Sequence, residues 1–257
     1  MRITTEQIRL TIYRAIPFIV FVLLWELFVH GNRERIFFFG SPLKIGTYLY
    51  QRSLDGSLWN DFKITLIEAL SGFIIGNLLG TLIGLGLWYS KTIFLIARPY
   101  IIVLGSAPVF ALGPLLVIWF GTGLQLKILI AAISTLFIAL FQAYTGASEV
   151  SREHLRLMET FRASKNQTFR KLIIPSVVVW VIAGLRINVG FAILGAFIGE
   201  FLSSNEGLGH LIVIAGGHTD ISLGFCGIFL LSCMALLLNS GVSRIEPNLK
   251  HWIVKYL

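Results

Sequence analysis

Charged residues are scarce in this chain: Asp, Glu, Lys and Arg make up 13% of its 257 residues, whereas soluble domains carry about 25%. Cysteine is nearly absent. Cys226 and Cys233 lie in one apolar run at a spacing that matches no metal or redox motif. No glycine is followed by lysine, so the phosphate-binding loop GxxxxGK[S/T] is missing. These gaps exclude an ordinary soluble domain and a P-loop ATPase, and they favour a packing role for both cysteines.

The chain also lacks a recognisable catalytic or metal-binding group of residues. The hydroxyl side chains inside its apolar runs have no histidine near them in sequence, so no nucleophile–base pair is predicted. His218 and Asp220 are too few for a metal site, and His154 has no Cys or His neighbour. We therefore expect a protein that is not an enzyme and that binds no metal or cofactor of its own.

Long apolar runs dominate what is present: 56% of the chain is hydrophobic, and its mean hydropathy is +0.81. A transmembrane helix needs about 20 mostly apolar residues. The third of the qualifying segments holds Pro99, Pro108 and Pro114 and is expected to be kinked or broken. The sequence predicts an all-α integral membrane protein, one domain over residues 1–257, with about six spans. These are 15–30, 63–88, 99–120, 127–147, 176–201 and 221–242.

The basic residues lie between the apolar runs rather than in one patch, which argues against nucleic-acid binding despite a net charge of +8. With the N-terminus inside, the inside segments would hold fourteen Lys and Arg residues and the outside segments six. Short cytoplasmic loops carry the excess of positive charge. We therefore predict a multi-pass protein of the cytoplasmic (inner) membrane, embedded in the lipid bilayer with both termini inside.

Four glycines recur at every fourth position of the second predicted span: Gly72, Gly76, Gly80 and Gly84. They lie on nearly one helix face, where the lack of a side chain lets a neighbouring helix approach closely. This pattern favours close helix packing over a ligand-binding role.

One predicted inside connection, residues 148–175, is unusually long. Loops of more than about 15 residues are usually functional or disordered. Leu155, Leu157, Met158 and Phe161 give this loop an apolar stripe at near-helical spacing, set among Arg and Glu. Because large apolar residues argue against disorder, we expect a short amphipathic helix here.

From residue 157 to residue 212 the chain reads LMETFRASKNQTFRKLIIPSVVVWVIAGLRINVGFAILGAFIGEFLSSNEGLGHLI. This resembles the signature region of binding-protein-dependent ABC importer permeases, in which an EAA-x-x-x-G stretch is followed by a proline, a G-L-R, a glutamate and a G-L-G. Upstream, the A-P…P-L…W-F-G-x-G run within 107–123 resembles the nitrate, taurine, alkanesulfonate and pyrimidine-precursor branch. The resemblance covers about residues 60–240.

The resemblance implies a type I importer permease fold in which the 148–175 loop carries a coupling helix that docks on a cytoplasmic ATPase. It implies two copies of the chain, or a pair with a similar chain. It also implies ATP and magnesium bound by the ATPase, and an extracytoplasmic binding protein that delivers a small, often anionic or vitamin-precursor-like solute. The positions that match the ATPase-coupling region are Met158, Glu159, Phe161, Arg162, Ala163, Ser164, Lys165 and Pro175. Those that match the translocation path or gate are Pro108, Pro114, Gly184, Arg186, Gly190, Glu200, Gly207 and Gly209.

The residues of the loop suit such docking: Phe161 and Met158 would enter an apolar groove, and Arg162 and Lys165 would meet carboxylates at its rim. Two features depart from the family pattern. By spacing, the signature glycine falls at Arg162 and the EAA triplet at Arg-Leu-Met, and glycine permits backbone angles that arginine resists. Glu68 stands where the branch often has a basic residue.

Two charged residues leave alternatives open. Arg186 lies about 16 Å along the fifth span from Pro175, near the middle of a membrane core of about 30 Å. Because an unpaired charge is costly there, Arg186 either lines the translocation path or pairs with backbone carbonyls or a carboxylate of another helix. Glu200 and the Gly207–Gly209 turn either form an outer gate, or a contact for the delivering protein, or make an ordinary interfacial turn with a water-facing carboxylate.

The rival hypothesis is a secondary transporter or channel that works without ATP. Such a protein predicts an internal repeat and several ionisable residues inside the membrane. No convincing repeat is evident, and Arg186 is the one cation well inside a predicted span. The sequence therefore favours the permease subunit of an ATP-driven importer.

Overall fold

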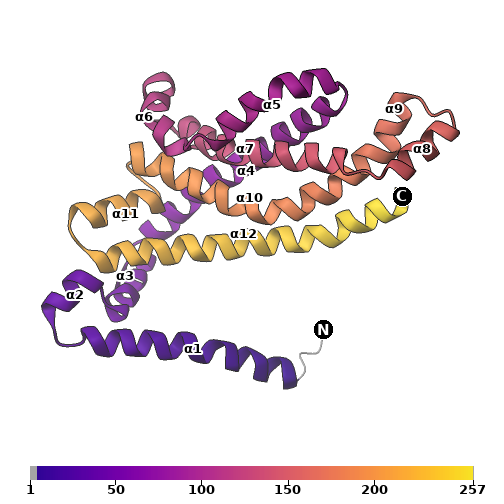
Figure 1. Cartoon of the computed structure of the whole chain (residues 1–257). Helices are drawn as coiled ribbons and strands as arrows, with labels where there is room; N and C mark the ends of the chain where they lie inside the picture. The colour runs from indigo at the N-terminus through magenta and orange to yellow at the C-terminus, as the bar shows by residue number, and fades with distance from the viewer. Residues whose placement is uncertain (1–4, 257) are drawn as a thin grey trace.

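The computed structural model describes the backbone of residues 5–256 and the side chains of residues 13–247. Within that part every regular element is a helix, which confirms the all-α prediction (Figure 1). The helices are α1 (Thr5–Val29), α2 (Arg33–Phe39), α3 (Pro42–Leu54), α4 (Ser57–Trp88), α5 (Lys91–Ser106), α6 (Val109–Phe120), α7 (Leu124–Ser148), α8 (Arg152–Thr160), α9 (Lys165–Thr168), η1 (Phe169–Ile173), α10 (Ile174–Ser203), α11 (Leu208–Gly217) and α12 (Ile221–Tyr256).

Each of the six predicted apolar segments coincides with a helix or a helix pair. Within the described residues, four helical stretches are long and apolar enough to cross a membrane, and a fifth arises if the bent pair α5–α6 counts as one span. The first predicted segment, 15–30, falls on α1, whose 25 residues match the length of a spanning helix. The chain thus runs back and forth along one axis.

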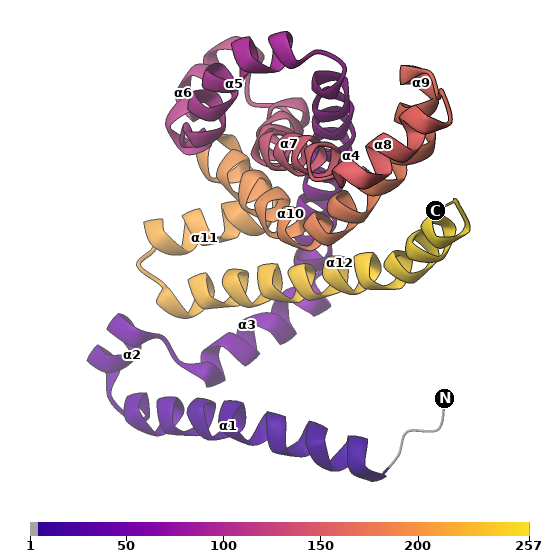
Figure 2. The same cartoon turned by 45° about the vertical axis from the view of Figure 1, so that its right-hand side comes forward.

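The two ends of the bundle differ in what they carry. In Figures 1 and 2, α1 begins and α12 ends at the end that holds α8 and α9, while α2 and α11 lie at the opposite end. We call these the α8 end and the α11 end. The start of α1 and the end of α12 therefore lie on one side, as an even number of crossings requires. Which side faces the cytoplasm stays a prediction.

Cysteine labelling tests that orientation. In a chain whose native cysteines are replaced by alanine, Arg156→Cys on α8 and Asn205→Cys beyond α10 lie at exposed positions. We expect a membrane-impermeant maleimide added to intact cells to label residue 205 and to reach residue 156 only after the membrane is opened. Labelling of both from the same side would contradict the predicted topology.

The third span is broken, as its prolines predict, but at only one of them. Helices α5 and α6 meet at 91°, and the break falls at Ala107 and Pro108, both in extended backbone conformations. Proline restricts the preceding residue to such angles and lacks the N–H that would continue the helix. Pro99 and Pro114 lie inside α5 and α6 without ending them.

Helices α4, α7 and α10 form the packed centre of the molecule, and the glycine stripe lies between α4 and α7. A Cβ atom on Gly72, Gly76, Gly80 or Gly84 would stand 2.0–2.5 Å from an atom of α7, far inside van der Waals contact. Gly86, which breaks the four-residue spacing, would meet nothing within 4 Å. The close-packing prediction is confirmed.

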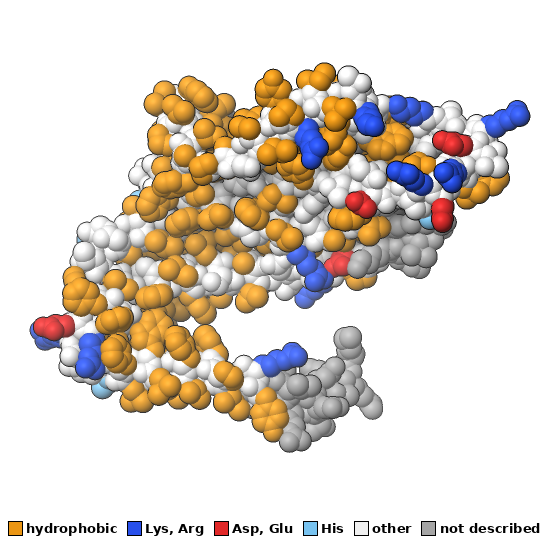
Figure 3. Space-filling model, in the orientation of Figure 1, with side chains coloured by type: hydrophobic (Ala, Val, Ile, Leu, Met, Phe, Trp, Pro, Cys, Tyr) orange, Lys and Arg blue, Asp and Glu red, His pale blue; other side chains and the backbone are white. Residues whose placement is uncertain are grey.

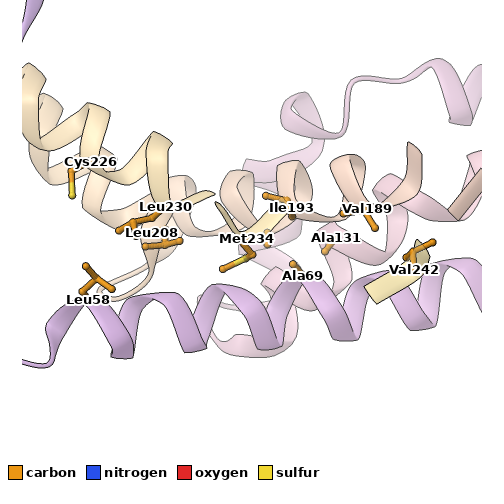
Figure 4. Close-up of a cluster of buried hydrophobic side chains, with 11 residues drawn as sticks. Leu58, Ala69, Ala131, Val189, Ile193, Leu208, Cys226, Leu230, Met234 and Val242 are labelled. Carbon is orange, nitrogen blue, oxygen red and sulfur yellow. The ribbon is translucent and has the colours of Figure 1, made fainter. Parts of the chain in front are cut away.

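A cluster of buried apolar side chains joins this centre to α12 (Figure 4). It includes Ala69, Ala131 and Val189, and α12 contributes Met234 and Cys226. Cys226 is fully buried in the cluster, which confirms the packing role expected of it. Gly195 and Gly199 of α10 lie directly against the backbone of α7, so the lack of side chains lets these two helices approach closely.

Candidate functional site

The segment between α7 and α10 forms two short helices at the α8 end. Ser151 caps α8, its hydroxyl accepting a hydrogen bond from the His154 backbone N–H. Beyond Phe161 the chain closes α8 with two backbone bonds, from Arg162 N–H to Glu159 O (2.8 Å) and from Ala163 N–H to Met158 O (2.9 Å). This is the Schellman pattern, which places the residue after the C-cap in the left-handed region.

Arg162 occupies that left-handed position, with φ of +50°. It stands where the family pattern has glycine, so the turn keeps the conformation for which glycine is suited although the glycine is missing. The turn therefore adopts a glycine-type geometry without glycine, and the arginine carries the backbone strain.

Arg162→Gly is therefore expected to stabilise the protein. Glycine adopts the left-handed conformation without a Cβ clash, which stabilises the folded state by about 1 kcal/mol relative to arginine. The greater backbone freedom of glycine in the unfolded chain partly offsets this gain. We expect a small rise in the unfolding midpoint in detergent. Arg156→Gly, in the middle of α8, is the matched control. It should lower the free energy of unfolding by about 1 kcal/mol, and the unfolding midpoint with it. A lower midpoint for Arg162→Gly would contradict the strain at this turn.

The next helix begins earlier than the sequence predicts. Ser164 and Gln167 form a capping box that starts α9, and helical structure continues without a break from Lys165 to Ser203. Pro175 lies in the first turn of α10, which agrees with its expected place at the start of the fifth span. The π turn η1 precedes it, with a bond from Ile174 N–H to Phe169 O, and this wider turn accommodates a proline that cannot donate to the carbonyl four residues back.

The start of this long helix is fastened to the α4–α5 turn. Lys165 Nζ donates to the backbone oxygen of Tyr89 at 2.5 Å, and its ammonium lies 5.9 Å from the ring centre of Trp88. Phe169 stacks on the same indole, with 5.5 Å between ring centres. The structure thus gives Lys165 an internal contact, where the sequence predicts a contact with the ATPase rim.

The apolar stripe of the loop divides into an inner and an outer half. Leu155 packs in a cluster with residues of α7 and α10, and Met158 lines a cavity of about 610 Å³ beside Trp180. Phe161 is 72% exposed and Leu157 is 51% exposed. We call these two exposed side chains the apolar tip. Figure 3 shows basic side chains around this end of the molecule.

At the α11 end, Glu200 holds the G-L-G turn. Its carboxylate accepts a hydrogen bond from the Thr65 hydroxyl at 2.6 Å and one from the Gly209 backbone N–H at 2.5 Å. The Thr65 hydroxyl in turn accepts from the Leu208 N–H at 2.9 Å. Glu200 is 1% exposed, so the alternative of an ordinary turn with a water-facing carboxylate is wrong, and a gate role stays a prediction.

Gly207 and Gly209 fit tightly against that carboxylate. Gly207 has φ of +109°, and a Cβ there would stand 2.3 Å from Glu200 Oε1. At Gly209 a Cβ would come within 2.8 Å of the other oxygen. Both backbone angle and space therefore require glycine at 207, which explains the motif physically.

A buried ion pair lies beside this turn. Lys127 Nζ, at the start of α7, is 3.1 Å from Glu68 Oε1 on α4 and donates to Ser204 Oγ at 2.7 Å. Glu68 is fully buried. The branch often has a basic residue at position 68, and here the buried cation comes from α7 instead. Together with Thr65 and Glu200 these residues form what we call the polar lock, which ties α4, α7 and α10 to the turn before α11.

Sequence reasoning missed most of the polar lock. Thr65 and Lys127 were not predicted as site residues, and Glu68 was noted only as a departure from the family. The available signal was a glutamate and a lysine in helices that are otherwise apolar, a pattern that calls for a partner because unpaired charges are costly in a membrane. Which residues pair depends on how the three helices pack.

Arg186 has a partner on another helix. Its guanidinium lies 2.6 Å from Glu246 Oε2 on α12, although the Arg186 side chain is 55% exposed in the isolated chain. Of the alternatives for Arg186, the structure shows pairing with a carboxylate of another helix. A role in the translocation path stays a prediction.

The other residues predicted for the translocation path differ in their surroundings. A Cβ on Gly184 would collide with Gln142 of α7, whereas a Cβ on Gly190 would meet nothing within 4 Å. Gly184 is thus a packing glycine, and Gly190 lies on an open face of α10. Pro108 marks the break of the third span and Pro114 lies within α6.

Comparison with known proteins identifies the family. Residues 76–252 match the family described as the binding-protein-dependent transport system inner membrane component. The chain belongs to this family. It is the membrane-spanning permease component, a transport subunit, of an ABC importer for small solutes.

Individual relatives agree with this assignment. A probable ABC transporter permease of Haemophilus influenzae is 30% identical over 85% of this chain and 89% of its own length. The formylaminopyrimidine transport permease of Halalkalibacterium halodurans is 28% identical over 91% of this chain and 93% of its own. The taurine transport system permease of Escherichia coli is 27% identical over 79% and 74%, respectively.

Solved structures show the same fold. The inward-facing methionine ABC transporter MetNI contains a chain that superposes with a TM-score of 0.60 at 17% sequence identity, covering 76% of this chain and 95% of that one. The type I importer permease fold predicted from the sequence is therefore confirmed, and so is the family resemblance on which it rested.

Proposed function

We propose that this permease docks on a cytoplasmic ABC ATPase through the apolar tip on α8. The observation that carries the proposal is the exposure of Phe161 and Leu157 immediately before a helical stretch that runs unbroken from Lys165 to Ser203. Large apolar side chains exposed outside the lipid-facing surface mark protein contacts. Arg162, exposed beside them, would pair with carboxylates at the rim of the ATPase groove.

Energy would then come from the partner. ATP and magnesium would bind to the ATPase, and closure of two ATPase copies would move the paired α8 segments and shift the spans between inward-open and outward-open states. The permease would act as a homodimer or with a similar chain in the cytoplasmic membrane. This chain would contribute no cofactor, metal or nucleotide site.

The solute would be small, and often anionic or vitamin-precursor-like. Support comes from relatives whose names refer to taurine, aliphatic sulfonates, formylaminopyrimidine and riboflavin. An extracytoplasmic binding protein would deliver it at the α11 end. Growth of a deletion strain on single sulfur, nitrogen or vitamin-precursor sources tests this, since loss of growth on one source alone identifies the solute class.

Co-purification tests the docking. The tagged permease, expressed with its native neighbouring subunits, should retain an ATPase through detergent extraction, and a photo-crosslinker at position 157 should link the two. The same crosslinker at exposed position 205, at the α11 end, is the control and should give no ATPase adduct. Absence of any ATPase, together with uptake that survives ATP depletion, would overturn the proposal in favour of an ATP-independent transporter.

A further inference from the structure

Two adjoining cavities lie among α2, α11 and the start of α12, at the α11 end. The larger, of about 400 Å³, is walled almost entirely by apolar side chains, among them Phe37, Phe38, Ile212 and Ile228. Phe37 and Phe38 are half or more exposed, so the cavity opens at the surface. It has the character of a dry groove that suits a hydrocarbon chain.

The second cavity, of about 370 Å³, continues from the first. It shares Phe37, Asp220 and Ile221 with the apolar groove and adds three basic side chains, Arg33, Lys44 and His218. A cationic pocket and a hydrocarbon groove thus meet along one wall. Figure 3 shows basic and hydrophobic side chains side by side at this end of the molecule.

The charge of the second cavity is not balanced from within. Among the described residues, the side chains of Arg33, Lys44 and His218 form none of the ion pairs or hydrogen bonds found. The one acidic residue in the wall, Asp220, already accepts from the Tyr48 hydroxyl at 2.5 Å and from the Leu223 N–H at 3.1 Å. The hydrogen bond that the Tyr48 hydroxyl donates to Asp220 raises the pKa of Tyr48 to about 12. The pocket therefore presents net positive charge.

Helix α2 stands where a membrane surface would lie. It reads Arg-Glu-Arg-Ile-Phe-Phe-Phe, polar in its first half and aromatic in its second, and it follows directly on α1, which holds the first predicted span. Helices that lie in a membrane interface combine Lys and Arg with Trp, Phe and Leu. Arg and Lys side chains bind phosphate groups through charge-assisted hydrogen bonds.

We propose that the two cavities together form a binding site for an anionic phospholipid, with its phosphate at Arg33 and Lys44 and one acyl chain in the groove beside Phe37 and Phe38. The inference rests on the membrane placement that the family establishes, and not on ATPase docking. A free phosphate would leave the adjoining apolar groove unused. A protein partner would not need an apolar groove that continues directly from the cationic pocket.

Native mass spectrometry of the detergent-purified full complex tests the proposal. After exposure to equal amounts of phosphatidylglycerol and phosphatidylcholine, the wild type should retain phosphatidylglycerol preferentially. Arg33→Gln and Lys44→Gln should each reduce that preference about fivefold, the effect of one basic residue near a lipid surface. Lys63→Gln, an exposed lysine on α4 outside both cavities, is the matched control and should leave it unchanged.

The apolar half has its own readout. Phe38→Ser should weaken retention of both lipids by on the order of fivefold, the effect of losing part of a buried aromatic surface, and should leave the preference between them intact. All of these positions are exposed, so the unfolding midpoints should match the wild type.

Three outcomes would overturn the proposal. One is equal retention of the two lipids by the wild type, and another is an unchanged preference in both cation variants. The third is protection against thermal unfolding by inorganic phosphate as strong as that by phosphatidylglycerol, which would indicate a simple anion site. If the cation variants keep lipid preference but lose stimulation by the binding protein, this surface is a protein dock instead. ATPase co-purification is unaffected by any of these results.

Discussion

Glu200→Ala is expected to abolish solute uptake and to lower the free energy of unfolding by about 3–5 kcal/mol. The substitution leaves two buried donors, the Thr65 hydroxyl and the Gly209 N–H, without their acceptor. It also opens a cavity where a fully buried side chain stood. The G-L-G turn and α11 would lose the carboxylate that holds them against α4.

Graded variants separate the charge of Glu200 from its shape. Glu200→Gln keeps one acceptor oxygen and most of the volume, so it should cost less than alanine and retain measurable uptake. Glu206→Ala removes an exposed carboxylate on the same loop and is the control, with an expected change within about 0.5 kcal/mol. Denaturant titration in mixed micelles gives the energies, and an unfolding midpoint for Glu200→Ala equal to that of the wild type would show that the polar lock does not stabilise the fold.

Phe161→Asp is expected to remove ATP-driven uptake while leaving the fold intact. Because the ring is 72% exposed, its loss costs the isolated chain little. An aromatic anchor at the centre of a protein contact contributes about 2–4 kcal/mol, so affinity for the ATPase should fall by a factor of about 30 to 1,000. Uptake into vesicles and retention of the ATPase on the tagged permease measure both effects.

Neighbouring variants distinguish loss of the ring from gain of a charge. Thr160→Asp adds the same charge at the adjacent exposed position and should reduce ATPase affinity by less than about tenfold. Phe161→Leu should retain most of the coupling, because it keeps an apolar side chain on the tip. Normal uptake by Phe161→Asp would show that the apolar tip is not the docking element. This conclusion does not depend on the results for the Glu200 variants.

Much of the fold follows from features that are local in sequence. Apolar runs of spanning length predict helices because backbone groups in lipid must bond within the segment. The stripe from Gly72 to Gly84 predicts a close helix contact, and the structure shows that the partner is α7. The break at Pro108 was harder to place. Pro99 and Pro114 restrict the backbone in the same way as Pro108, and only the surrounding packing decides which of the three prolines ends a helix.

The functional features that escaped prediction depend on distances across the fold. Lys127 and Glu68 are far apart in sequence, and their pairing needs the register of α4 against α7. Glu200 lies near a predicted helix end, which left water exposure open as an alternative, but the turn at Gly207 folds back over it. Arg162 was recognised as a departure from the family, and the sequence could not show that the turn would keep its left-handed geometry.

The helical stretch from Lys165 to Ser203 has a consequence for how movement spreads through the molecule. At 1.5 Å per residue its length is about 58 Å. The turn at Arg162 directly precedes one end, and Glu200 lies near the other. If it pivots as a rigid body about its middle, a tilt of only 5° displaces each end by about 2.5 Å in opposite directions. That shift is close to the length of a hydrogen bond. A small rotation imposed beside α8 would therefore be enough to make or break the contacts of Glu200 with the G-L-G turn.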